Sequence, residues 1–243
     1  MHGVSAKDDM IYAVIDLLGP SLEDLFRACG KRFSLKTSLM IWYQIIERLE
    51  AMHEREFMHA DLKPENLLMG LKERSNIIHM IDFGLTRSVA DPKTGEHIPL
   101  TRTKSLSGTI RYISLNGHKG YALSRRDDLI SLGYMIIRFI TGGLPWQKIA
   151  TRKNSLFDRG VGKSKALHQK DNKLYKGCPV EVHQYMNYVT SLKFKESANF
   201  DHLRTLIKRA AQQANVDIFD DIFDWDILFT NQESKVDLHR LHE

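Results

Sequence analysis

Apolar residues along the chain follow two spacings, and each spacing predicts a different kind of element. Residues 10–18 form an almost unbroken apolar run, which predicts a strand buried on both faces. From Ser34 to about Glu54, apolar side chains recur at steps of three and four, which predicts a long helix with one buried face. Trp42 lies on that face, so we expect it in the core rather than at a ligand site.

Four further segments carry helical signals, and they alternate with shorter segments of other kinds. These helices are expected at residues 21–28, 127–140, 180–191 and 199–214. The segment 127–140 is apolar almost all round, which predicts a buried central helix. Short apolar runs predict strands at 67–69 and 77–81. The segments 83–116 and 148–177 show little periodicity, so we predict no regular element for them.

The composition is typical of an ordinary globular protein, with 42% hydrophobic and 27% charged residues among 243. No apolar run approaches the roughly 18 residues that span a bilayer, so we expect no membrane partner. Asp8 and Asp9 lie where a secretory signal needs basic and apolar residues, which favours the cytoplasm or nucleus. Cys29 and Cys178 are expected to be packed, reduced thiols.

The net charge of +5 is concentrated between residues 148 and 176. For most of these side chains we expect a solvated face, and a functional alternative is a surface for acidic or phosphorylated peptides. Interleaved aromatic residues are lacking, so a specific nucleic-acid partner is not expected. Residues 159–164 look like a phosphate loop, but Phe157 takes the place of the first required glycine and no strand leads in. We therefore reject that motif.

Two motifs in the first half of the chain resemble those of protein kinases. Residues 59–66 read His-Ala-Asp-Leu-Lys-Pro-Glu-Asn, and Asp-Phe-Gly follows at 82–84 after a short apolar run. Together they resemble a kinase catalytic loop and metal-binding loop. The resemblance implies that Asp61 accepts the proton of a substrate hydroxyl and that Lys63 steadies the transferred phosphoryl group.

The same resemblance implies two cofactors, ATP and Mg²⁺. Asn66 and Asp82 would hold the metal ion against the phosphates of ATP. Phosphoryl transfer needs charge neutralisation and an attacking oxygen placed in line, and these residue types can provide both.

Further segments make the chain similar to the casein kinase I family of serine/threonine protein kinases. The similar segments are Leu17–Phe26, Gly108–Tyr112, Ser114–Asn116, Ser124–Leu129, Leu144–Gln147 and Phe223–Trp225. The resemblance extends over nearly the whole chain and implies an α+β, mostly helical fold. It assigns residues 19–230 to the large, C-terminal lobe of a kinase and 1–18 to a remnant of the small lobe and the hinge. Residues 231–243 would form a loose tail.

The resemblance also assigns the binding site for adenine. Ile15 would guard the back of this site. Asp16, Leu17 and Leu18 would form the hinge beside the base, with the Leu18 backbone hydrogen-bonded to adenine. Leu68 and Ile81 would form its apolar floor. Each of these residues has a plain structural interpretation as well, and for Ile15 and Ile81 both interpretations can hold.

Further residues receive roles, or are candidates for them, by position in the family. Thr109 would tie the substrate-docking segment to the catalytic loop. Asp128 would be a buried acid that holds the catalytic-loop backbone. Arg111 would be a basic member of a pocket for substrate anions, with Lys148, Arg152 and Lys153 as candidates for a second.

The chain also departs from the kinase pattern. Ala60 takes the place of an arginine that usually receives an activation-loop phosphate, so we do not expect switching by that phosphate. Residues 1–57 contain no Gly-x-Gly-x-x-Gly pattern and no lysine–glutamate pair of the kind that kinases place over ATP.

Three hypotheses follow from these observations. The chain is an ATP-dependent serine/threonine kinase for acidic protein substrates, a non-catalytic kinase-like binding module, or an incomplete gene product. The two motifs retain all four residues that this chemistry uses, namely Asp61, Lys63, Asn66 and Asp82. Their presence favours the first and third hypotheses. We expect weak activity from this chain alone, and self-association through an exposed N-terminal strand.

Overall fold

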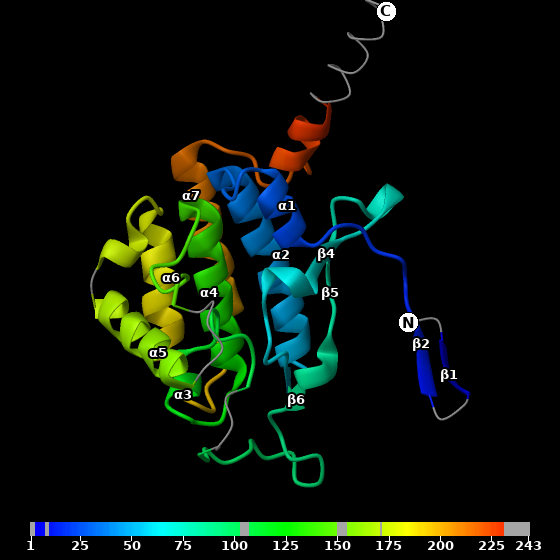
Figure 1. Cartoon of the computed structure of the whole chain (residues 1–243), viewed down its shortest axis with the longest axis vertical. Coiled ribbons are helices and arrows are strands. Elements are labelled where there is room, and N and C mark those ends of the chain that lie inside the picture. Colours follow the sequence, from blue (N-terminus) through cyan, green and yellow to red (C-terminus); the bar gives the residue numbers. More distant parts are fainter. Residues whose placement is uncertain (1–2, 8–9, 103–106, 150–154, 171, 231–243) are drawn as a thin grey trace, which may run out of the picture.

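The computed structural model describes residues 3–7, 10–102, 107–149, 155–170 and 172–230. Most of them form helices packed around one apolar core, and the strands are short (Figure 1). The mostly helical α+β composition expected from the sequence is therefore confirmed. No helix in the described part of the chain is both long and apolar enough to cross a membrane.

The elements follow one another in an order that places the strands early and most helices late. The α-helices are α1 (Leu22–Ala28), α2 (Leu35–His53), α3 (Leu115–His118), α4 (Arg125–Thr141), α5 (Ser155–Lys170), α6 (Val180–Ser191) and α7 (Phe200–Ala214). The 3₁₀ turns are η1 (Pro64–Asn66), η2 (Lys72–Arg74), η3 (Phe83–Leu85) and η4 (Asn172–Tyr175). The strands are β1 (Gly3–Lys7), β2 (Met10–Val14), β3 (Phe57–Met58), β4 (Leu67–Met69), β5 (Ile78–Met80) and β6 (Arg87–Ser88). They pair antiparallel as β1 with β2, β3 with β6, and β4 with β5.

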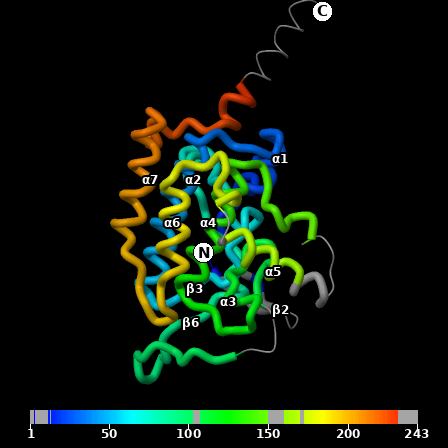
Figure 2. Tube along the Cα trace, turned by 90° about the vertical axis from the view of Figure 1, so that its left-hand side faces the viewer, coloured from blue at the N-terminus to red at the C-terminus, as the bar shows by residue number. Residues whose placement is uncertain are grey.

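Helix α4 is the buried centre of the molecule, as its all-round apolar sequence predicts. It packs against α2 and α6, which lie on either side of it (Figures 1 and 2). Trp42 of α2 is fully buried and makes an edge-on ring contact with Tyr185 of α6, with 4.9 Å between ring centroids. The core position expected for Trp42 is confirmed.

Helix starts were the best-predicted boundaries because their signals are local. The Ser21 side chain accepts from the backbone N–H of Asp24, and the Asp24 carboxylate accepts in return from the Ser21 backbone N–H. Ser34 caps α2 and Asn199 caps α7 by accepting one backbone N–H each, without the return bond. Each cap satisfies donors that have no partner inside the helix. Strands β4 and β5 also lie where they were expected.

The prediction of a strand over residues 10–18 that is buried on both faces is wrong. Strand β2 ends at Val14 and forms a hairpin with β1 that stands apart from the helices (Figure 1). The exposed fractions of Tyr12, Val14 and Leu17 are 45%, 55% and 84%. The apolar run predicts a strand correctly, but in the described chain no second layer covers it.

A second correction concerns the basic stretch from residue 148 to 177, where we predicted no regular element. It contains α5, which packs on α3 (Figure 2). Gly160 and Gly162 weaken the helical signal there because glycine is a poor helix former. The rejected phosphate loop lies inside this helix, so that rejection is confirmed. Residues 150–154, with Arg152 and Lys153, and the expected tail at 231–243 lie outside the described residues.

Both cysteines are free thiols, as expected. Burial raises the pKa of Cys29 to about 11, with a further contribution from the nearby charge of Asp224. Burial raises the pKa of Cys178 to about 12. Both thiols are therefore protonated and unreactive at neutral pH.

Candidate active site

The backbone of the loop after β3 is held by a single buried carboxylate. Asp128, in the first turn of α4, accepts hydrogen bonds from the backbone N–H groups of His59 (2.7 Å) and Ala60 (2.9 Å). The ring of His53 donates to the same carboxylate through Nε2 at 3.1 Å. Ala60 has a left-handed backbone with φ of 68°, so the chain turns sharply at this point. Asp128 thus fixes the backbone immediately before Asp61.

His59 joins this loop to the segment that carries Asp82. Its Nδ1 accepts from the backbone N–H of Asp61 at 3.3 Å, so the neutral ring carries its proton on Nε2 and donates to the carbonyl of Ile81 at 3.0 Å. The N–H of Ile81 donates in turn to the carbonyl of Asn66 at 3.0 Å. Both backbone groups of Ile81 are therefore tied to the loop, which places Asp82 beside it.

Asp61 is nearly buried and accepts three hydrogen bonds. Lys63 donates from Nζ to Oδ2 at 2.7 Å, and Thr109 donates to Oδ1 from both its backbone N–H and its hydroxyl, each at 2.7 Å. Burial opposes ionisation of the carboxyl group, but the hydrogen bonds from Lys63 and Thr109 outweigh it and lower the pKa of Asp61 below its ordinary value. At neutral pH Asp61 is an ionised carboxylate that can accept a proton.

Thr109 reaches Asp61 because the residue before it is glycine. Gly108 has a φ of 91°, in the left-handed region that favours glycine. A Cβ at this position would lie 2.7 Å from the carbonyl oxygen of Ala60. Any larger residue would push the segment after it away from the loop.

Asn66 and Asp82 offer oxygen atoms of the kind that Mg²⁺ prefers. Asn66 is buried and donates from Nδ2 to the carbonyl of Asp61 at 3.1 Å, which leaves its Oδ1 as an acceptor. Asp82 is exposed and has a left-handed backbone, with φ of 62°. Among the described residues there is no group of three or more His, Cys, Asp or Glu side chains that could hold a metal. One amide and one carboxylate fit Mg²⁺ shared with phosphate groups, rather than an all-protein cage.

The residues expected around adenine do not gather in one pocket of the structure. Asp16 and Leu18 line a pocket of about 250 Å³ together with His79, and this pocket includes neither Leu68 nor Ile81 in its lining. Leu68 and Ile81 are half-buried, close to the end of the loop at residues 59–66. Ile15 is 59% exposed, at the base of the hairpin. The adenine site stays a prediction.

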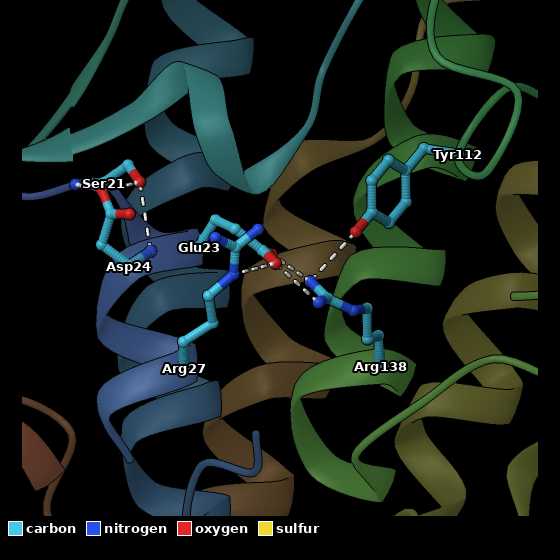
Figure 3. Close-up of polar contacts among 6 residues, drawn as sticks. All are labelled: Ser21, Glu23, Asp24, Arg27, Tyr112 and Arg138. Atoms are coloured by element: carbon cyan, nitrogen blue, oxygen red, sulfur yellow. Dashed lines mark hydrogen bonds and ion pairs between the residues drawn. The ribbon is translucent and has the colours of Figure 1, made fainter. Parts of the chain in front are cut away.

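The segment after Thr109 rests on a buried charged network that sequence reasoning missed. Arg138 of α4 forms a fork-like ion pair with Glu23 of α1, with N–O distances of 2.6 and 3.1 Å, and donates to the hydroxyl of Tyr112 at 3.1 Å (Figure 3). Burial opposes the charge of Arg138, but the pairing with Glu23 outweighs it and raises the pKa of the guanidinium group. The sequence did carry a signal for this ion pair. Glu23 and Arg138 are charged residues of opposite sign within two predicted helices, and both lie on buried faces.

Arg111 was expected to meet substrate anions, and its placement neither requires nor contradicts this. Its side chain is half-buried, with Cζ 5.9 Å from the centroid of the Tyr112 ring. Its carbonyl oxygen accepts from the indole N–H of Trp146 at 2.9 Å. Of the other candidates for this anion site, Lys148 is exposed, and Arg152 and Lys153 lie outside the described residues. The site stays a prediction.

The geometry thus brings together Asp61, Lys63, Asn66 and Thr109, with Asp82 beside them. Comparison with known families gives an independent result. Residues 1–206, most of the chain, match the model of the protein kinase domain. The match includes both motifs, the hairpin and helices α1 to α6. This chain belongs to the protein kinase domain family.

Proposed function

We propose that this chain is a serine/threonine protein kinase of casein kinase I type, which transfers the γ-phosphate of ATP to hydroxyl groups of acidic protein substrates. Membership of the protein kinase family supports the reaction class. The observation that carries the proposal is the state of Asp61, an ionised carboxylate held in place by Lys63 and Thr109.

The roles in this reaction follow from the chemistry of each side chain. Asp61 accepts the proton of the attacking hydroxyl, and Lys63 stabilises negative charge beside it. Asn66 and Asp82 would hold Mg²⁺, which neutralises charge on the phosphates when it is bound. Since phosphoryl transfer needs little covalent assistance, correct placement of these groups provides most of the catalysis.

The casein kinase I type is supported by the family-like segments of the sequence and by the placement of Thr109. In this proposal residues 19–230 are the large lobe, and the hairpin belongs to the small lobe. Ile15, Asp16, Leu18, Leu68 and Ile81 would surround adenine once the hairpin lies against the large lobe. Arg111, Arg152 and Lys153 would meet acidic or phosphorylated substrates in the cytoplasm or nucleus.

The test is phosphate transfer from labelled ATP to casein, which is acidic and rich in serine. We expect turnover well below the ordinary kinase range of about 1–100 per second. The 243 residues lack the glycine-rich loop and its lysine–glutamate pair, and each missing preorganised group costs about a hundred- to a thousandfold in rate. Turnover in the ordinary range would contradict this expectation.

Two variants make the test specific to Asp61. Asp61→Asn keeps the size of the side chain but removes the proton acceptor, so it should abolish the remaining transfer. Asp91→Asn, in an exposed turn, is the matched control and should leave transfer unchanged. Retained transfer in Asp61→Asn would exclude Asp61 as the base. Binding of ATP and casein without any transfer would identify the chain as a non-catalytic binding module.

A further inference from the structure

The backbone carbonyl groups of residues 109–113 all accept hydrogen bonds from within the protein. The carbonyl of Thr109 accepts from the N–H of Tyr112 at 2.8 Å, and that of Tyr112 accepts from the hydroxyl of Ser131 at 3.0 Å. Trp146 serves the carbonyl of Arg111. The two that remain both accept from one side chain of α5. The Nζ of Lys165 lies 2.8 Å from the carbonyl oxygen of Ile110 and 2.6 Å from that of Ile113.

Lys165 is an unusual lysine because no part of it is exposed. Its Nζ lies 5.0 Å from the ring centroid of Tyr134 and 5.4 Å from that of Trp146. In the described part of the chain its partners are two carbonyls and two ring faces, and no carboxylate is among them. Burial lowers the pKa of this amine well below its ordinary value. The surrounding sequence predicts a solvated basic face, and Lys165 is the exception to it.

The alternative role for Lys165 is simple filling of space in the core. An apolar side chain of similar length would fill the same space without the cost of removing an amine from water. It would leave the carbonyls of Ile110 and Ile113 buried without donors, which costs more than the loss of an ordinary hydrogen bond. The amine is therefore needed for the backbone that it contacts.

That backbone lies directly after the residue that contacts Asp61. Thr109 binds Asp61 at one end of the segment, and Arg138 holds the Tyr112 hydroxyl near the other (Figure 3). Lys165 lies between these two anchors and binds the carbonyls on either side of Arg111 and Tyr112. Its removal would free the middle of the segment while both anchors remain.

We infer that Lys165 is a positioning residue for the protein substrate, which acts by fixing the backbone of residues 110–113 against α5. The part of this inference that concerns a substrate rests on the proposed kinase function. The part that concerns the backbone does not, and the two parts are tested separately.

The backbone is tested by amide hydrogen exchange in the full chain. Lys165→Met retains the length of the side chain and removes the donors, so exchange at the amides of Tyr112 and Ile113 should become at least tenfold faster. Lys163→Met, an exposed lysine two residues away on the same helix, is the matched control and should change neither amide. Unchanged exchange at Tyr112 and Ile113 in a folded Lys165→Met protein would overturn the inference.

A second variant keeps the test decisive if Lys165→Met does not fold. Trp146→Phe keeps an aromatic ring beside Lys165 but removes the N–H that serves the carbonyl of Arg111. We expect severalfold faster exchange at the same two amides. No change there would show that these carbonyl contacts do not hold the segment, and would overturn the inference.

The substrate is tested by the binding of a serine peptide flanked by glutamates and, separately, of Mg·ATP. In Lys165→Met the Kd of the peptide should rise about tenfold, while the Kd of Mg·ATP changes by less than twofold. A filling role would change both constants or neither, and either outcome would overturn the substrate part. If the unaltered chain binds Mg·ATP but no such peptide, the proposed substrate class fails while the exchange result on Lys165 still stands.

Discussion

The loop at residues 59–66 and the hairpin of β1 and β2 differ in the regularity of their backbone and in their contacts with the rest of the protein. The loop contains only one short 3₁₀ turn, yet its backbone and side chains contact α4, the 81–82 segment and Thr109. The hairpin has a regular antiparallel ladder, and in the described chain each of its strands pairs only with the other. Well-defined placement thus comes from distant partners rather than from local regularity.

This difference has a physical basis in burial. An isolated two-stranded hairpin is marginally stable in water, because paired backbone groups gain little without an apolar face to bury. In the loop, the buried polar groups would be costly if they were unpaired, and each contact therefore restricts the backbone strongly. We expect substitutions around the loop to have large effects and substitutions in the hairpin to have small ones.

The largest effect is expected from Asp128→Ala. It would leave the backbone N–H groups of His59 and Ala60, and the ring of His53, without their shared acceptor. Each unsatisfied buried group costs about 1–3 kcal/mol, so we expect the free energy of unfolding to fall by about 4 kcal/mol. Urea denaturation measures this change.

The matched control for this variant is Glu73→Ala, which removes an exposed carboxylate. It should change the free energy of unfolding by less than about 0.5 kcal/mol. An effect of Asp128→Ala no larger than that of the control would mean that Asp128 does not hold the loop.

A smaller loss of about 3 kcal/mol is expected from Arg138→Met, because breaking a buried ion pair leaves one charge without its partner. Arg27 also contacts Glu23, at 3.2 Å, and this contact moderates the loss. The double variant Glu23→Leu/Arg138→Met should recover much of the stability, since no lone charge remains. Equal losses in the single and double variants would show that the charges are not coupled.

Much of the fold was predictable because the signals are local. The caps at Ser21 and Ser34 and the apolar face around Trp42 are each encoded within a few neighbouring residues. The spacing of Asp61 and Lys63 is equally local. The resemblance to a known family was needed to connect Thr109 with this pair, because 48 positions separate it from Asp61.

The features that escaped prediction depend on partners far away in the sequence. An apolar run specifies a strand, but whether that strand is buried depends on a covering layer elsewhere. Lys165 has the appearance of a surface residue in a basic stretch, and its burial is decided by Trp146 and Tyr134. Helix α5 was missed for a different reason, since glycine and basic residues dilute its periodicity.

A subtler effect is expected from Thr109→Val, which removes one hydroxyl hydrogen bond from Asp61. In the folded chain the pKa of Asp61 is lowered, so Asp61 contributes stability above its unfolded pKa of about 3.9 and loses it as the pH falls through the folded value. With one donor fewer, the folded pKa should rise toward its ordinary value. An NMR titration of the Asp61 carboxyl measures this, and the control is Thr205→Val, at an exposed position of α7. An unchanged midpoint would show that the hydroxyl does not stabilise the ionised form.

The smallest effect on stability is expected in the hairpin, from Tyr12→Ser combined with Val14→Thr. Both side chains are exposed, so the free energy of unfolding should change by less than about 0.5 kcal/mol.

The same surface presents apolar side chains beside an open strand edge, and burying apolar area is worth roughly 25 cal/mol per Å². We therefore propose that the unaltered chain self-associates through this hairpin and that the variant does so less. Light scattering across a concentration series measures it, with Lys119→Ser as a control on another exposed surface. A monomer at every concentration, unchanged by the substitutions, would contradict the proposal, and a large loss of stability would show that the hairpin is packed as firmly as the loop.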